Sequence, residues 1–247
     1  MTFFDIKNIA EREMELVNPS SPEKVVRAGW AAGLRPGLHV IEFGCGYGEV
    51  LALWAQHFGI SGVGIDIREH ACERARRKMS ERGLADRIEI VHGNGAEYEF
   101  RPRGFDVAAC VGASFIWGGF RPTIRAMSRA VKPEGRLVVG EVYWSRSEVP
   151  PTYARGESHP VPTEAQLARM AREEGFELSY VLHSNVDDWD SYEAENWRSL
   201  QLWLEENPDH PERHEVLAEL RSSQDEYLTY AREFMGWALY VLAPGQG

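Results

Sequence analysis

The chain has little of what several protein classes depend on. Its 247 residues include three cysteines and no Cys-x-x-Cys pair, so we expect free thiols in a reducing compartment and no metal site. No uninterrupted apolar run approaches the roughly 18 residues that a membrane-spanning helix needs. Basic residues are outnumbered 27 to 38, and the formal net charge of −11 disfavours nucleic acid and anionic membranes as partners.

Targeting signals and repeats are missing as well. The first residues lack a basic region followed by an apolar run, so we expect no signal peptide and a cytoplasmic location. The sequence contains no internal repeat and no low-complexity tract. Its length fits one α/β domain, with or without an insertion.

What the chain does have is a glycine-rich stretch, VIEFGCGYGE, at residues 40–49. The apolar residues at its start predict a strand buried on both faces, and residues 49–58 predict the helix that follows. Gly44, Gly46 and Gly48 have no Cβ, so the backbone between strand and helix can adopt positive φ and lie directly against a ligand.

The glycine spacing distinguishes two kinds of cofactor. A dinucleotide fingerprint, G-x-G-x-x-G, would need a third glycine at Glu49, whereas the chain reads E-x-G-x-G-x-G. Glu42, at the carboxyl end of the strand, would repel a pyrophosphate and attract a cationic ligand. An NAD-dependent oxidoreductase is therefore the less favoured alternative.

A second acid, Asp66, ends the strand predicted at residues 60–67. A carboxylate at the tip of the neighbouring strand can accept both hydroxyl protons of a ribose. The alternative role for Asp66 is to cap the helix predicted at residues 68–82. The basic side of that helix predicts a solvated face made of Arg74, Arg76, Arg77, Lys78 and Arg82.

These features together resemble motif I and its neighbours in class I S-adenosylmethionine-dependent methyltransferases, in particular the bacterial small-molecule branch of methyltransferase types 11 and 25. The resemblance is firm from the first strand to the fifth. It implies an α/β, Rossmann-like fold: a seven-stranded mixed sheet in the order 3-2-1-4-5-7-6, with the last strand antiparallel and helices on both faces. It also implies S-adenosyl-L-methionine as cofactor and S-adenosyl-L-homocysteine as product.

The resemblance further implies which residues bind the cofactor. Asp66 would hold the ribose and Ile67 would lie against the adenine. Asn94 stands where relatives have an acid; its carbonyl can accept a hydrogen bond from the adenine amino group, or it can simply form a turn. The full predicted set is Glu42, Gly44, Cys45, Gly46, Gly48, Asp66, Ile67, Asn94, Gly95, Ala96, Val111 and Gly112.

The substrate is expected at the carboxyl ends of the fourth and fifth strands, after a K-P-x-G turn at residues 132–135. Glu141 is a candidate general base if burial raises its pKa, or a structural partner for an arginine or a helix N-terminus. Neither the Pro-Pro-Tyr/Phe nor the Pro-Cys signature of DNA methyltransferases occurs, which favours a small-molecule acceptor. The predicted pocket residues are Ser114, Trp117, Tyr143 and Trp144.

We predict three parts. Residues 1–36 form N-terminal helices over the cofactor site, the first at residues 5–17 and the second from Ser21. Residues 37–184 and 235–247 form the methyltransferase core, with a proline-rich loop at 145–162. Residues 185–234 form a helical cap inserted between strands six and seven. Its aromatic residues are mostly core, with Trp189 or Trp197 as candidates to face a substrate.

The predicted reaction is an in-line displacement that moves the methyl group to an unidentified small molecule. A non-catalytic protein that binds S-adenosylmethionine would share every feature above, and a protein-modifying methyltransferase also stays open. A helical cap favours a closed pocket over a polypeptide groove. The sequence predicts neither the acceptor atom nor the oligomeric state.

Overall fold

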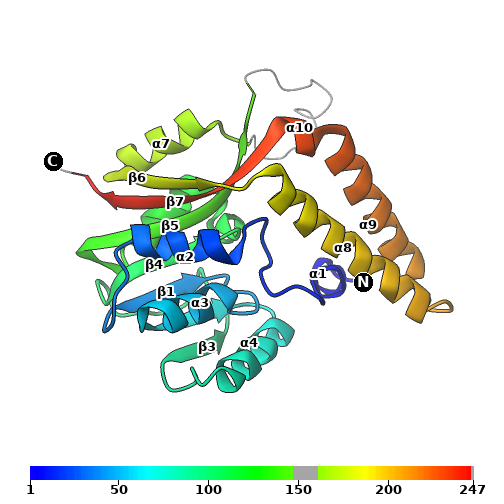
Figure 1. Ribbon diagram of the computed structural model, residues 1–247, viewed down its shortest axis with the longest axis horizontal. Coiled ribbons are helices and arrows are strands. Elements are labelled where there is room, and N and C mark those ends of the chain that lie inside the picture. The colour runs from blue at the N-terminus through cyan, green and yellow to red at the C-terminus, as the bar shows by residue number, and fades with distance from the viewer. Residues whose placement is uncertain (147–160, 246–247) are drawn as a thin grey trace.

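The computed structural model describes residues 1–146 and 161–245, so most of the predicted loop at 145–162 lies outside the described residues. A seven-stranded sheet in the order β3-β2-β1-β4-β5-β7-β6 forms the centre, and β7 is antiparallel to both of its neighbours (Figure 1). The predicted topology is therefore confirmed. In sheet order the strands are β3 Ile88–His92, β2 Ser61–Asp66, β1 His39–Phe43, β4 Phe105–Val111, β5 Val131–Trp144, β7 Met235–Pro244 and β6 Phe176–His183.

Helices cover both faces of the sheet, and each face has its own apolar core. The central parallel strands β1, β2 and β4 are buried on both sides, as parallel strands flanked by helices require, whereas the edge strands β3 and β6 are partly exposed. One face carries α2 (Pro22–Ala31), α3 (Glu49–Phe58) and α4 (Glu69–Glu81). The other carries η1 (Ser114–Trp117), α5 (Phe120–Ser128) and α7 (Glu164–Glu173).

A third, smaller core lies outside the sheet, in the insertion between β6 and β7. The insertion consists of α8 (Val186–Glu206), α9 (Arg213–Glu226), a π-helical turn η2 (Tyr227–Ala231) and α10 (Arg232–Phe234). Figure 1 shows α8 and α9 extending away from the sheet, with α1 (Phe3–Ala10) beside them. The core that these three helices share consists of Ala10, Leu200, Leu204, Val216 and Leu220.

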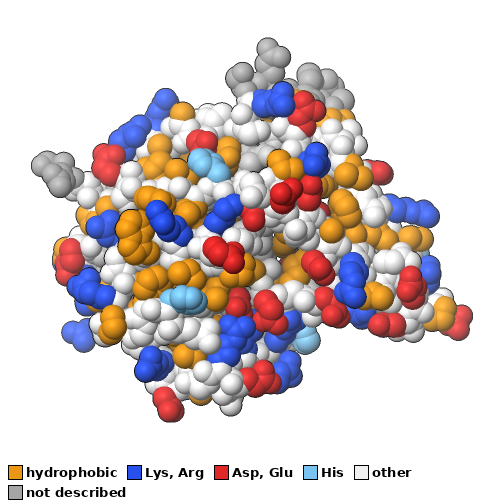
Figure 2. Space-filling view, in the orientation of Figure 1, with side chains coloured by type: hydrophobic (Ala, Val, Ile, Leu, Met, Phe, Trp, Pro, Cys, Tyr) orange, Lys and Arg blue, Asp and Glu red, His pale blue; other side chains and the backbone are white. Residues whose placement is uncertain are grey.

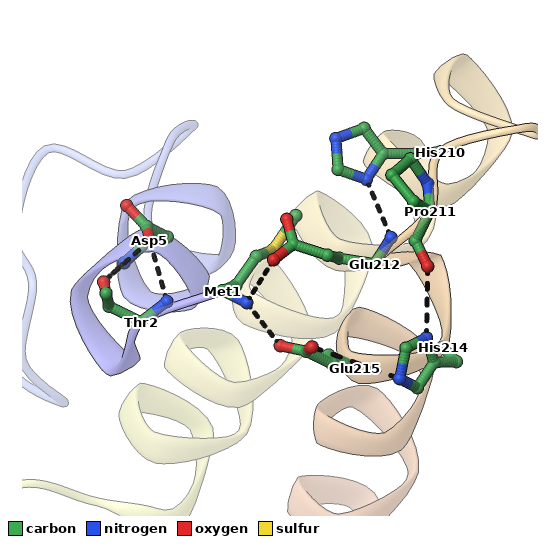
Figure 3. A network of polar contacts seen from close by, with 8 residues as sticks. All are labelled: Met1, Thr2, Asp5, His210, Pro211, Glu212, His214 and Glu215. Carbon is green, nitrogen blue, oxygen red and sulfur yellow. Dashed lines mark hydrogen bonds and ion pairs between the residues drawn. The ribbon is translucent and has the colours of Figure 1, made fainter.

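The first helix is shorter than predicted and begins earlier: it spans Phe3–Ala10 rather than 5–17. A capping box explains its start, because the Thr2 side chain accepts a hydrogen bond from the Asp5 backbone and the Asp5 carboxylate accepts one from the Thr2 backbone. Figure 3 shows this cap beside the amino group of Met1, which donates to Glu212 at 2.7 Å and Glu215 at 2.6 Å. These hydrogen bonds, the one to Glu212 first, raise the pKa of the amino group to about 10.

The two helices of the predicted N-terminal segment 1–36 pack against different parts of the structure. Ile6, Ile9 and Ala10 lie on one side of α1 and pack into the third core, between α1, α8 and α9, which we call the cap core. In contrast, α2 lies on the sheet face, where Trp54 of α3 donates a hydrogen bond to the carbonyl of Val25 at 2.7 Å. Thus α1 belongs with the cap, whereas α2 belongs with the sheet.

The K-P-x-G segment at 132–135 lies within β5, not in a turn before it. The register against β4 jumps between the pairs Phe105↔Val131 and Val107↔Arg136, so the segment bulges out of the ladder. Pro133 cannot donate to the ladder, which fits its place in a bulge. Strand five therefore starts at Val131, before the K-P-x-G segment rather than after it.

Charged and apolar side chains alternate over the face shown in Figure 2, without a continuous basic patch on it. No helix in the described ranges 1–146 and 161–245 is long and apolar enough to cross a bilayer. Across the same ranges, no three His, Cys, Asp or Glu side chains are arranged to hold a metal ion.

Candidate functional site

A cavity of about 340 Å³ lies at the carboxyl ends of β1, β2 and β4. Its floor includes eight of the predicted cofactor residues, and α1 and α8 close it from above. Ligand sites in open α/β sheets lie at this edge, where the strand order reverses. The predicted residues that line it are Gly44, Gly46, Asp66, Ile67, Asn94, Gly95, Val111 and Gly112.

The conformation of the glycine loop depends on residues that have no side chain. Gly44, Gly46 and Gly48 have φ values of +70°, +52° and +71°, which L-residues with a side chain rarely adopt. A Cβ on Gly44 would lie 2.4 Å from Cβ of Ala113, and one on Gly46 would lie 2.7 Å from Val17. The loop is therefore packed against the protein itself as well as being open to a ligand.

Asp66 joins the glycine loop to the neighbouring strand. Its Oδ2 accepts a hydrogen bond from the Gly46 backbone at 2.8 Å, and its Oδ1 accepts one from the Arg68 backbone at 2.9 Å. The second contact lies just before α4, but it is not the helix cap of the alternative prediction, because the N-cap residue is Arg68 and no side chain caps the helix. Each carboxylate oxygen has a further lone pair, so both contacts leave room for hydroxyl donors from a ribose.

Glu42 and Asn18 line a small hollow of about 10 Å³ beside the glycine loop, next to Gly44 and Val111. The Glu42 side chain is completely buried, and burial, followed by the charge of Asp66, raises its pKa well above the usual range. Oε2 of Glu42 and Oδ1 of Asn18 are both buried without a hydrogen-bond partner. Two buried acceptors that lack donors destabilise the free protein unless a ligand supplies those donors.

The remaining predicted cofactor residues lie behind the cavity surface. Cys45 lines the small hollow. Gly48 faces α4, where a Cβ would lie 2.8 Å from Met79. The Ala96 backbone donates to the Asn94 side-chain oxygen at 3.0 Å, so these two residues form a turn that also borders the cavity. Their contacts with adenine stay predictions.

The four predicted substrate residues do not line the cavity as the described residues form it. Trp117 packs edge-on against Phe43, with ring centroids 5.1 Å apart. Tyr143 packs against His183 at 5.7 Å. The Trp144 backbone donates to Pro162 at 2.9 Å, next to the undescribed segment 147–160.

Ser114, the fourth of them, donates its hydroxyl hydrogen bond to Glu141. The Glu141 carboxylate also accepts from the Val142 backbone at 3.0 Å. Burial raises its pKa, against the opposing effect of these hydrogen bonds. Ser114 follows the cavity residue Ala113 in the chain, but neither Ser114 nor Glu141 belongs to the cavity lining that the described residues form.

The basic side of α4 is a solvated face only in part: Arg76 and Arg77 are exposed as predicted, but Lys78 and Arg74 are not. Lys78 is 6% exposed and donates to Glu49 at 2.6 Å. Arg74 lies over the Tyr47 ring, 4.0 Å from its centroid, and donates to the backbone of Arg12. A cation can be buried when carboxylates and carbonyls surround it. These side chains instead hold the segment after α1 against the glycine loop.

Residues that sequence analysis missed form the roof. From α1 and its C-cap residue come Phe3, Phe4, Lys7 and Glu11, which share one face at i, i+3 and i+4 spacings. Glu11 accepts from Arg68 at 2.6 Å. The other missed lining residues are Val17, Ile65, Arg68, Ala113, Phe115, Ile116 and Tyr192.

Comparison with known proteins decides the family. A model of the methyltransferase domain matches residues 40–135. The Escherichia coli protein YjhP is 34% identical over 96% of this chain and 97% of its own length. A crystal structure of a Geobacter sulfurreducens SAM-dependent methyltransferase in complex with S-adenosyl-L-homocysteine has a TM-score of 0.91 and 35% identity, covering 97% of this chain and 98% of that one.

The chain belongs to the S-adenosylmethionine-dependent methyltransferases. A second such enzyme, from Thiobacillus denitrificans and also in complex with S-adenosyl-L-homocysteine, has 33% identity and a TM-score of 0.91, covering 99% of this chain and 100% of that one. The cofactor of this methyltransferase is therefore S-adenosylmethionine, as predicted. The residues present fit it, because the two buried acceptors beside the glycine loop suit a ligand that carries an ammonium group.

Proposed function

We propose that this methyltransferase holds S-adenosylmethionine in the cavity at the ends of β1, β2 and β4 and transfers its methyl group to a small molecule in the cytoplasm. The cofactor supplies a methyl group on a sulfonium, which is already strongly electrophilic. The protein then has to position the reactants in line and exclude water. The roof of α1 and Tyr192 supports exclusion of water, because it closes the cavity opposite the glycine loop.

The single observation that carries the proposal is the pair of unpartnered acceptors at Glu42 and Asn18. The hollow that they share, about 10 Å³, has room for roughly one water-sized group. An ammonium donates three hydrogen bonds and carries the charge that would stabilise the ionised form of Glu42. We therefore assign the ammonium of the cofactor's amino acid part to these two residues.

The rest of the predicted set takes complementary roles in this proposal. Asp66 holds the ribose hydroxyls, and Ile67, Asn94 and Gly95 border the adenine. Glu141 accepts the proton that an O–H or N–H acceptor must release, relayed through the Ser114 hydroxyl that donates to it. The helical cap supports a closed site for a small acceptor over a groove for a polypeptide.

Calorimetry with two ligands tests the assignment. S-adenosylhomocysteine carries the amino acid part, whereas 5′-methylthioadenosine lacks it. Asn18→Leu should weaken binding of S-adenosylhomocysteine about tenfold, the equivalent of one hydrogen bond, and leave 5′-methylthioadenosine binding unchanged. Ser199→Ala is the control, because Ser199 is also buried with an unpartnered side-chain oxygen but lies on α8 and does not line the cavity.

Two results would contradict the proposal at different levels. If the wild type binds no S-adenosylhomocysteine, the cavity is not the cofactor site. If the wild type binds it and Asn18→Leu binds equally well, only the assignment of the ammonium is wrong. Transfer is tested by incubating a cell extract with methyl-labelled cofactor. The label should enter the low-molecular-weight fraction, and label confined to protein or nucleic acid would refute a small acceptor.

A further inference from the structure

Exposed apolar side chains gather at the mouth of the cavity. The described residues include eight large apolar side chains that are exposed, and four of them line this one cavity: Phe3 (65%), Phe4 (37%), Ile67 (49%) and Phe115 (67%). Single exposed apolar residues are ordinary on a protein surface, but their convergence on one concavity indicates an apolar ligand.

The aromatic members come from two distant parts of the chain. Phe3 and Phe4 belong to α1, and Phe115 belongs to η1 after β4. The opposite side of α1 packs into the cap core, which fixes the direction in which its aromatic face points. The helix is further fixed at its end by Glu11 and Arg68, whose side chains are 8% and 11% exposed. The aromatic face is thus held over the cavity by two independent contacts.

One cation at this mouth stands outside the ion pairs that join the other charged residues. Four charged residues line the cavity, and three of them are paired: Arg68 lies 2.6 Å from Glu11 and 3.5 Å from Asp66. Lys7, the fourth, forms no ion pair or hydrogen bond with another described residue. Its ammonium lies 5.8 Å from the centroid of the Phe3 ring.

The acids near Lys7 are already engaged. Glu11 is paired with Arg68, and Glu193 on α8 accepts a hydrogen bond from Trp189 at 3.1 Å. Burial raises the pKa of Glu193, whereas the Trp189 hydrogen bond and the more distant charge of Lys7 lower it. Lys7 is therefore the cation that remains available to a ligand entering between the aromatic side chains.

We infer that the mouth binds the methyl acceptor and that this acceptor is an apolar molecule with an anionic group, a carboxylate or a phosphate, held by Lys7. The inference rests on the proposed function, because it takes the inner part of the cavity for the cofactor. Phe3, Phe4 and Phe115 bury the apolar body, and Lys7 selects the anionic end. The electrostatic attraction between an anion and a partly buried cation is stronger than that between the same two charges in bulk water.

Calorimetry with the full chain, saturated with S-adenosylhomocysteine, provides the test. The probes are decanoate, decyl phosphate and decan-1-ol, which share an apolar chain and differ in the head group. Wild type should bind the two anions more tightly than the alcohol. Lys7→Met keeps the length and apolar surface of the side chain and should weaken the anions about tenfold, with no change for decan-1-ol. The better-bound anion identifies which of the two groups the acceptor carries.

Two further variants complete the design. Arg77→Met removes an equal charge from an exposed position on α4 outside the cavity and should change no affinity. Phe115→Ala should weaken all three probes. Melting temperatures, measured in parallel, separate a binding effect from unfolding.

Three results would overturn the inference. The first is a wild type that binds S-adenosylhomocysteine but neither anion, which leaves the proposed function standing. The second is an equal loss of the anions in Lys7→Met and Arg77→Met, which would mark a general charge effect. The third is a Lys7→Met variant that loses S-adenosylhomocysteine but not 5′-methylthioadenosine, because Lys7 would then hold the cofactor's own carboxylate.

Discussion

Arg68 and Glu11 form a 2.6 Å ion pair that joins the start of α4 to the end of α1, across 57 residues of sequence. Both side chains are nearly buried, so the pair lies in a region of low dielectric constant. Because Arg68 also contacts Asp66 at 3.5 Å, the ion pair connects the cavity roof to the acid assigned to the ribose.

Breaking this pair should release α1. Removing one partner of a buried ion pair leaves the other charge uncompensated, at a cost of about 3–5 kcal/mol. In Glu11→Gln we expect faster hydrogen exchange at residues 3–10 and faster dissociation of S-adenosylhomocysteine. The control is Glu174→Gln, because Arg125 in the Arg125–Glu174 pair is 67% exposed and such pairs contribute about 1 kcal/mol or less. Equal exchange rates in Glu11→Gln and wild type would show that the pair does not hold the helix.

A methyl group added at Gly44 should destabilise the protein more than the same change at a glycine with open space around it. Gly44→Ala combines a positive φ with a 2.4 Å contact to Ala113, whereas Gly83 has a φ of +66° and nothing within 4 Å. Gly83→Ala therefore measures the backbone cost alone, about 1–2 kcal/mol. We expect Gly44→Ala to lose more unfolding free energy than Gly83→Ala and to bind S-adenosylhomocysteine at least about 100-fold more weakly. Equal losses in urea denaturation would show that the loop can relax.

Replacing Glu42 should stabilise the protein without ligand and weaken its binding of the cofactor. Burial raises the pKa of Glu42, so between the unfolded and the folded pKa the native state holds a proton that the unfolded state has lost. The contribution of Glu42 to the free energy of unfolding of the wild type therefore falls as the pH rises through that interval. Glu42→Gln removes the effect, and its advantage over wild type should grow from the ordinary glutamate pKa upward. Urea denaturation at several pH values measures it, and an advantage that does not change with pH would contradict it.

The Ser114 hydroxyl should hold down the pKa of Glu141. Burial is the main influence on this carboxyl and raises its pKa, whereas the Ser114 hydrogen bond lowers it. Ser114→Ala should therefore raise the pKa further, as measured by ¹³C NMR of the Glu141 carboxyl. Ser128→Ala is the control, because Ser128 donates to the Arg125 carbonyl on an exposed part of α5. A lower or unchanged pKa in Ser114→Ala would remove Ser114 from the proposed proton path.

Local signals predicted the sheet and the glycine loop, and long-range contacts account for what was missed. Residues 49–58 form the predicted helix because glycines with positive φ bound it at Gly48 and Gly59. By contrast, the burial of Lys78 depends on Glu49, 29 residues away. Asn18 and Tyr192 likewise reach the site only through tertiary packing: the Asn18-Pro19 dipeptide indicates a turn, but no local pattern assigns either residue to the site.

The place of the cap in the chain has an evolutionary consequence. The cap leaves the sheet after β6 and returns at β7, and these strands are antiparallel neighbours with His183 paired to Ala238. Both ends of the insertion therefore emerge at nearly one point, so a segment of another length or sequence could replace it without re-threading any strand. Exchange of this one contiguous segment is therefore a route by which enzymes with the same sheet can differ in acceptor, and chimeras joined at β6 and β7 would test it.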